Sequence, residues 1–116
     1  MKLWLDDVRK PPKGWVWAIN YDEAVSHLMT GEVVEISLDH DLGMEVIGNH
    51  KNILIGVESQ TAKTGYDVAC WIEEEVYEGR LTAPIMYCHS ANPVGKGRIN
   101  QVITKVNHYA GNNPLV

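Results

Sequence analysis

Polar side chains that can bind a metal ion or a phosphate follow three separate apolar segments of this sequence. The densest cluster, Asp39-His40-Asp41, comes soon after the apolar run Val33-Val34-Glu35-Ile36. Two other apolar segments end in Asp6-Asp7 and in His89-Ser90-Ala91-Asn92. In open parallel sheets, ligands bind at the edge where the carboxyl ends of the strands lie. The clusters therefore predict one site built from the ends of neighbouring strands.

The carboxylates of these clusters predict a divalent metal site. Several carboxylates held close together repel one another unless a cation or protons neutralise them. We assign Asp6, Asp7 and Asp39 as metal ligands, with Mg²⁺ as the ion that best suits carboxylate oxygens and water. The neighbouring histidines would also accept Mn²⁺ or Zn²⁺. Because either Asp6 or Asp7 alone could simply cap a loop, the metal prediction depends on the whole set.

A metal at this edge could polarise a phosphoryl oxygen while a positioned water attacks phosphorus. His40 and His89 are the candidates for deprotonating that water or protonating the leaving oxygen. Asp41 would orient His40. A purely structural role is the alternative for His40.

Phosphate-binding side chains are expected opposite the acidic cluster. Asn92 followed by Pro93 is typical of a helix start, where anions bind readily. Ser90, Asn92 and Lys96 are predicted to bind the phosphate there, together with Arg9 after the acidic pair. Two of these assignments have alternatives, since Arg9 could merely pair with the neighbouring carboxylates and Ser90 could satisfy backbone groups.

Alternating strand and helix patterns must position these residues. Short apolar segments predict strands over 2–5, 15–19, 33–38 and 85–88. Amphipathic spacing predicts helices over 22–30, from Thr64 to the residue before Gly79, and from about Asn92 or somewhat later. The segment Lys10-Pro11-Pro12-Lys13-Gly14 excludes a regular helix between the first two strands. We predict an α/β fold, a four-stranded parallel sheet of order 2-1-3-4 with helices on both faces.

Two further features have alternative interpretations. Residues 44–63 contain two apolar segments around a turn-like stretch, and we interpret them as a hairpin or flap inserted beside the site. A loosely ordered surface insertion is an equal alternative. The tryptophans are assigned to the hydrophobic core, most firmly Trp4 and Trp71, in preference to a role as stacking platforms.

Length, charge and cysteine content limit the class of protein. A chain of 116 residues predicts a single domain, 1–116. A net charge of −5 without a basic patch excludes long duplex nucleic acid as a partner, whereas a small phosphorylated ligand can bind through a metal. No apolar run is long enough to cross a membrane. The two cysteines, Cys70 and Cys88, form no disulfide framework, so we expect a cytoplasmic protein.

The polar motifs together resemble the cyclic-phosphate processing receiver-like domain, a divergent relative of response-regulator receiver domains. The matching segments extend over most of the chain: Leu5-Asp6-Asp7-x-Arg9-x-Pro11, Ser37-Leu38-Asp39-His40-Asp41-Leu42-Gly43, Thr64-Gly65-Tyr66-Asp67 with Trp71-Ile72-Glu73, and His89-Ser90-Ala91-Asn92-Pro93-Val94-Gly95. The resemblance implies a three-layer receiver-like (flavodoxin-like) fold and the opening of cyclic phosphates. It places Asp6 and Asp7 at the receiver acidic pair, Asp39 at the phosphoacceptor position and Ser90 at the hydroxyl position.

Departures from an ordinary receiver favour hydrolysis over a phosphorylation switch. The sequence has no fifth strand ending in lysine, a Pro-Pro loop replaces the first helix, and His40 and His89 have no receiver counterpart. The leading hypothesis is a metal-dependent phosphoesterase that opens a small cyclic phosphate, such as a 2′,3′-cyclic nucleotide or an ADP-ribose cyclic phosphate. The alternative is a non-catalytic module that binds a nucleotide or a partner protein. A weaker third hypothesis is a true phosphoacceptor at Asp39.

Overall fold

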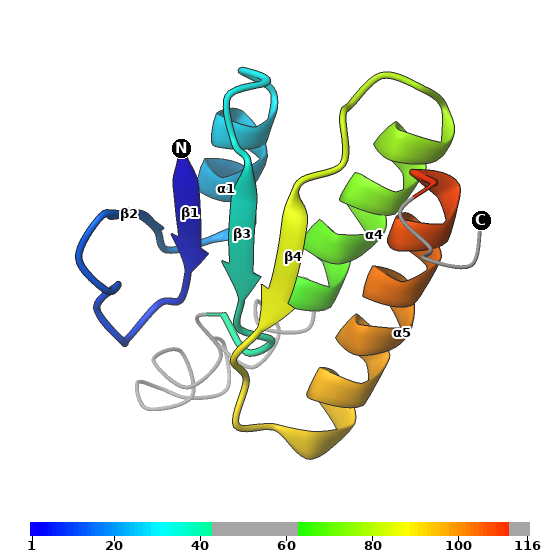
Figure 1. Ribbon diagram of the computed structural model, residues 1–116. Helices are drawn as coiled ribbons and strands as arrows, with labels where there is room; N and C mark the ends of the chain where they lie inside the picture. The colour runs from blue at the N-terminus through cyan, green and yellow to red at the C-terminus, as the bar shows by residue number, and fades with distance from the viewer. Residues whose placement is uncertain (43–62, 112–116) are drawn as a thin grey trace.

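The computed structural model describes residues 1–42 and 63–111 (Figure 1). Four parallel strands form one sheet in the order β2-β1-β3-β4: β1 (Lys2–Leu5), β2 (Trp15–Ala18), β3 (Glu35–Leu38) and β4 (Ile85–Cys88). The helices are α1 (Tyr21–Leu28), α4 (Gly65–Tyr77) and α5 (Pro93–Tyr109). The predicted strand order is confirmed, whereas the predicted hairpin or flap lies, apart from Lys63, outside the described residues. None of the helices in the described part of the chain has the length and apolarity that crossing a bilayer requires.

One face of the sheet carries the hydrophobic core. Side chains alternate between the two faces of a strand, and the parallel register aligns Leu3 with Ile36 and Ile36 with Met86. All three are buried, as are Leu5 and Leu38 two residues further along their strands. The helices supply the opposing half of this core through Leu28, Val68, Ile72, Ile99 and Val106.

The described helices all pack on this face, which differs from the prediction of helices on both faces. α1 contacts α4, and α4 packs along α5 (Figure 1). From β2 the chain moves across the sheet to β3 and then to β4, so right-handed crossovers place α1 and α4 on the same side. The step from β1 to β2 runs the opposite way and would cover the other face, but its proline-containing connection forms no helix. The second face therefore has no helix over it in the part of the chain that the structure describes.

Aromatic side chains populate this second face. Trp15 makes edge-to-face contacts with Trp4 and Tyr87, with ring centroids 6.2 Å and 6.5 Å apart. The assignment of tryptophans to the core holds for Trp71, which packs against it. It does not hold for Trp4, because residues at alternate positions of β1 face opposite sides and Trp4 lies on the side away from the helices.

Side-chain caps determine where the described helices begin, and those of α4 and α5 lie next to the site. Thr64 and Asp67 form a capping box at the start of α4, as the sequence predicts. The Asn92 side-chain oxygen accepts two backbone amides in the first turn of α5, and Pro93 occupies the first helical position. Of the two starts that the sequence allowed for α5, the earlier one is therefore observed.

Candidate functional site

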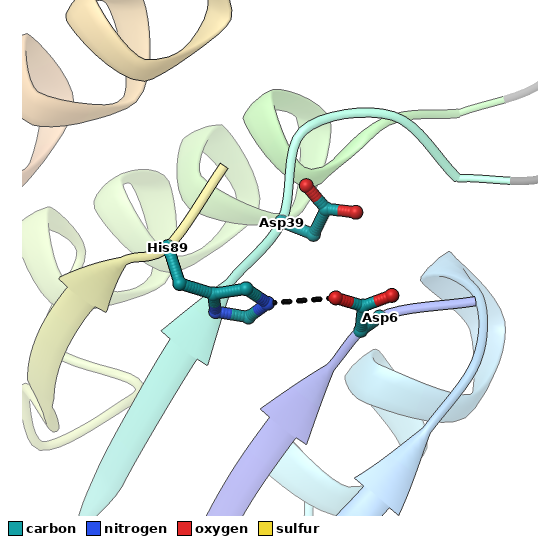
Figure 2. Close-up of side chains that lie close together, drawn as sticks. All are labelled: Asp6, Asp39 and His89. Atoms are coloured by element: carbon teal, nitrogen blue, oxygen red, sulfur yellow. Dashed lines mark hydrogen bonds and ion pairs between the residues drawn. The ribbon is translucent and has the colours of Figure 1, made fainter. Parts of the chain in front are cut away.

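The carboxyl ends of β1, β3 and β4 bring three predicted site residues together. The final residues of these strands are paired in the register, so the next residues, Asp6, Asp39 and His89, leave the sheet side by side (Figure 2). Each offers one ligand atom, and these atoms all lie within 4.8 Å of one another. Strand register thus converts positions far apart in the sequence into one cluster.

The Asp6 side chain is fully buried, and its carboxylate has four hydrogen-bond contacts. Its Oδ1 accepts the backbone amides of Val8 and Arg9, both at 2.8 Å. Its Oδ2 accepts Arg9 Nε at 2.9 Å and contacts His89 Nε2 at 3.0 Å. Burial acts to raise the pKa of this carboxyl, but the hydrogen bonds and the Arg9 charge together hold the pKa below its usual value. Asp6 is therefore ionised at neutral pH.

Arg9 bridges the two buried carboxylates. Its Nε binds Asp6, and its Nη2 lies 3.4 Å from Asp39 Oδ1. The Arg9 carbonyl accepts a hydrogen bond from Trp4 Nε1 at 2.9 Å, which fixes the loop that carries the guanidinium. The sequence left open whether Arg9 clamps a phosphate or pairs with the carboxylates. In this structure it pairs with them while its side chain stays 49% exposed.

Asp39 has a less favourable environment than Asp6. It is 6% exposed, and its Oδ1 accepts the His40 backbone amide at 2.9 Å. Burial raises the pKa of Asp39, and the negative charges of Asp6 and Asp41 raise it further, against the opposing effect of Arg9 and the amide. Adjacent carboxyl groups whose pKa values shift in opposite directions are typical of functional sites.

The His89 imidazole is held by three neighbours. It stacks on the Trp4 indole, with ring centroids 3.8 Å apart and planes 5° from parallel. Ser37 Oγ lies 2.7 Å from its Nδ1, and Asp6 Oδ2 lies 3.0 Å from its Nε2. Burial lowers the pKa of His89 by more than the Asp6 carboxylate raises it. The ring is therefore neutral at neutral pH, and both of its nitrogens have partners.

His40 belongs to a second group of contacts next to this cluster. Its Nδ1 lies 2.7 Å from Asp41 Oδ1, so the predicted orienting contact is present. Asp41 Oδ1 also accepts Asn92 Nδ2 at 3.3 Å, which ties the loop after β3 to the start of α5. The imidazole packs against Gly95, where only a glycine leaves room for the ring.

Replacing Gly95 by alanine is expected to displace His40. The new Cβ would lie 2.4 Å from His40 Cγ, so the ring or the helix must shift at a cost of about 1–3 kcal/mol in the free energy of unfolding. Gly97→Ala is the matched control in the same helix, because its new Cβ meets nothing within 4 Å. That variant should gain about 0.5–1 kcal/mol. Chemical denaturation measures both, and equal stabilities would contradict this packing.

A cavity of about 270 Å³ opens over this edge of the sheet. Among the described residues its lining comprises Asp6, Asp7, Val8, Arg9, Asp39, Asp41 and Ala91. Asp7, predicted as a metal ligand, lines the cavity but is not part of the three-ligand cluster. Ser90 makes the contact expected if it only satisfies backbone groups, because its hydroxyl accepts the Asn92 backbone amide. The Asn92 side chain caps α5. Lys96 is exposed on the first turn of α5.

Sequence reasoning missed the roles of Trp4 and Ser37, which both contact His89. The two residues are paired between β1 and β3. Each lies two positions before a site aspartate, so its side chain faces the same side of the strand as that aspartate. The alternation of side chains could have placed Trp4 and Ser37 on the same face as the site aspartates. It could not show that this face lacks a helix among the described residues, which is what leaves both side chains free to contact His89.

The chemistry of the donor set fits a divalent cation. Two carboxylates and an imidazole can each turn one ligand atom toward a common centre. Mg²⁺ prefers the oxygens, whereas Mn²⁺ and Zn²⁺ also accept the imidazole nitrogen. The cluster differs from the predicted ligand set by having His89 where the prediction had Asp7. Because Arg9 contacts both Asp6 and Asp39, a cation must compete with its guanidinium.

A comparison with protein families matches most of the chain. A family model described as the cyclic-phosphate processing receiver domain matches residues 1–105. The match begins before β1 and ends within α5, so it contains all of the site residues described above. No curated protein and no solved structure matches the chain.

Proposed function

Because this chain belongs to the cyclic-phosphate processing receiver domain family, we propose that it is a metal-dependent phosphoesterase that opens a small cyclic phosphate. The observation that carries the proposal is the cluster of Asp6, Asp39 and His89 beside the cavity. Holding two carboxylates out of water is costly unless their charge is compensated. Arg9 supplies one positive charge to the pair, and a divalent cation would supply the larger compensation that two carboxylates need.

Asp6, Asp39 and His89 are the residues that would hold the cation. When bound there, a divalent ion polarises a phosphoryl oxygen and stabilises the negative charge that develops during attack on phosphorus. Arg9 lines the cavity and carries a guanidinium suited to paired phosphate oxygens. Once displaced from the carboxylates, it is placed to bind the substrate. Lys96 adds a positive charge on the first turn of α5.

His40 is the proposed acid–base residue. Water adds to phosphorus, one P–O bond of the ring breaks, and the leaving oxygen takes up a proton to give a phosphate monoester. Asp41, which lines the cavity, holds His40 Nδ1 at 2.7 Å. Nε2 would then exchange the proton, although His40 itself is not among the described residues of the lining. His89 is better suited to holding the cation than to moving protons, because both of its nitrogens already have buried partners.

The proposed substrates are a 2′,3′-cyclic nucleotide or an ADP-ribose cyclic phosphate. A cavity of about 270 Å³ is slightly below the range of roughly 300–1,000 Å³ that encloses a complete small-molecule ligand. The cavity would therefore take the cyclic phosphate and its sugar, leaving the remainder of the molecule outside.

Arg9→Gln should strengthen cation binding and weaken substrate binding. Removing the guanidinium that lies 2.9 Å from Asp6 and 3.4 Å from Asp39 removes a competing positive charge, so we expect about tenfold tighter Mn²⁺ binding, equivalent to about 1.4 kcal/mol. Calorimetric titration with Mn²⁺ measures this, and KM for the cyclic phosphate should rise. Lys10→Gln makes the same charge change on an exposed neighbour and is the control. Weaker Mn²⁺ binding in Arg9→Gln alone would show that Arg9 organises the carboxylates instead of competing for them.

A second candidate function is non-catalytic binding of a nucleotide or a partner protein. It is favoured by the second face of the sheet, where Trp17, Ile85 and Tyr87 are 39%, 56% and 46% exposed. Exposed apolar side chains on one face of a sheet are a feature that interaction sites share. If the ligand is a nucleotide, both candidates bind its phosphate at the carboxyl edge of the sheet. They then differ in whether the phosphate ester is hydrolysed.

Phosphorus NMR separates these functions. The protein is incubated with a 2′,3′-cyclic nucleotide or an ADP-ribose cyclic phosphate and Mg²⁺, Mn²⁺ or Zn²⁺, with a chelator as the control. We expect a phosphate monoester to form only when a cation is present. Absence of product with every cation and both substrates would contradict hydrolysis and favour the binding module. A stable acyl phosphate on Asp39 would instead indicate a phosphoacceptor.

A further inference from the structure

We propose that Ser37 positions His89 for cation binding, because its hydroxyl can serve either tautomer of the imidazole. The Ser37 Oγ atom lies 2.7 Å from His89 Nδ1 at a position that is 5% exposed. This inference rests on the proposed function, since it concerns how the chain prepares one ligand of the proposed cation site. It gives Ser37 a role that neither the sequence motifs nor the ligand set assigned.

Without a cation, the contacts of His89 define one tautomer. The Asp6 carboxylate can only accept a hydrogen bond, so the proton of the neutral ring belongs on Nε2, 3.0 Å from Asp6 Oδ2. Nδ1 then carries a lone pair. The Ser37 hydroxyl donates to it, which satisfies both nitrogens of a side chain that is 16% exposed.

With a cation, the same ring must present the opposite tautomer. Ligation through His89 Nε2 requires a lone pair there, so the single ring proton moves to Nδ1 through solvent, and the count of protons on the ring is unchanged. Nδ1–H then donates to Ser37 Oγ, which becomes the acceptor. A hydroxyl can exchange these roles by rotating, whereas a carboxylate in its place could only accept. Partners of this kind on the far nitrogen orient metal-binding histidines in general.

Trp4 makes this exchange possible without movement of the ring. The imidazole lies flat on the indole, with 3.8 Å between centroids and 5° between planes. The indole is itself fixed by its hydrogen bond to the Arg9 carbonyl. With the ring plane held in this way, only the hydroxyl hydrogen and the imidazole proton need to move between the two states.

The test follows the protonated nitrogen of His89 directly. Nitrogen-15 NMR of the imidazole, assigned with a His89→Asn variant, is recorded on the full chain with and without Zn²⁺. We expect the proton on Nε2 without Zn²⁺ and on Nδ1 with Zn²⁺. In Ser37→Ala we expect about 10- to 100-fold weaker Zn²⁺ binding, with recovery in Ser37→Thr, which restores the hydroxyl. Ser26→Ala, an exposed serine on α1, is the matched control and should bind as wild type does.

The outcomes distinguish this inference from the proposed function. A ring that keeps its proton on Nε2 in the Zn²⁺ complex would overturn the tautomer exchange, as would Zn²⁺ binding in Ser37→Ala as tight as in wild type. If the protein nevertheless hydrolysed a cyclic phosphate, the proposed function would stand without this role for Ser37. Binding of Zn²⁺ with the expected exchange but no turnover of any cyclic phosphate would support the role of Ser37 and count against the enzyme.

Discussion

Asp39→Asn should abolish cyclic-phosphate turnover, with kcat/KM about 10³-fold below wild type. An amide supplies no negative charge to a cation, and loss of several kcal/mol of transition-state charge stabilisation corresponds to a factor of that size. Kinetics at saturating Mg²⁺ and Mn²⁺ measure the loss. Because Asp39 follows the last residue of β3 and asparagine has nearly the same shape, the substitution removes the negative charge of one ligand while leaving the strand unchanged.

The same variant should be at least as stable as wild type. The raised pKa of Asp39 means that the folded protein binds this proton more tightly than the unfolded chain does. Its contribution to stability is therefore present at low pH and is lost as pH rises through the folded-state pKa. Asparagine stays neutral and avoids this loss, so thermal unfolding at pH 7 should show an equal or higher midpoint. Asp22→Asn, on the exposed first turn of α1, controls for charge and should keep full activity. Retained turnover in Asp39→Asn would contradict the role of Asp39 as a cation ligand.

Gly65→Ala should destabilise the protein by roughly 3 kcal/mol, near the upper end of what overpacking usually costs. A Cβ at this position would lie 1.7 Å from the Asp39 carbonyl oxygen and 2.8 Å from its carbonyl carbon. These are backbone atoms, so no side chain can rotate away to make room. The Gly65 amide also donates to the His40 carbonyl at 2.9 Å. Urea unfolding measures the loss of stability.

The Gly65 variant also tests how α4 supports the site. Displacing the start of α4 moves the Asp39–His40 backbone, so activity measured well below the unfolding midpoint should fall along with stability. Gly97→Ala again provides the control, since it adds a methyl group to a helix without a clash. Wild-type stability in Gly65→Ala would contradict the close packing of α4 against the loop after β3.

The sheet and the convergence of its strand ends could be predicted because each depends on local patterns and on connection rules. Short apolar strands separated by helices imply a parallel sheet, and right-handed crossovers limit the strand order. Once that order is known, acidic residues directly after β1 and β3 must meet at one edge. The starts of α4 and α5 were readable for the same reason, since caps such as Thr64 and Asn92 act within one turn.

The finer features of the site could not be predicted because they depend on which groups meet across the sheet. Arg9 could bind a phosphate or a carboxylate by its chemistry alone, and only the distances to Asp6 and Asp39 decide between them here. The core assignment of Trp4 failed because the expected helix layer on its face is not found in the described part of the chain. By its chemistry alone His89 could move protons or hold a cation, and its contacts with Ser37 and Asp6, which engage both nitrogens, are the basis for proposing the second role.

The most direct measurement of the central claim is the position of a bound cation. A crystal of the wild-type protein grown with Mn²⁺ and examined by anomalous diffraction would locate the ion without reference to activity. We expect a manganese peak within ligand distance of Asp6, Asp39 and His89 Nε2, with the Arg9 guanidinium displaced from the two carboxylates. A guanidinium that still bridges Asp6 and Asp39, with manganese bound elsewhere or not at all, would contradict a metal-dependent reaction at this edge of the sheet.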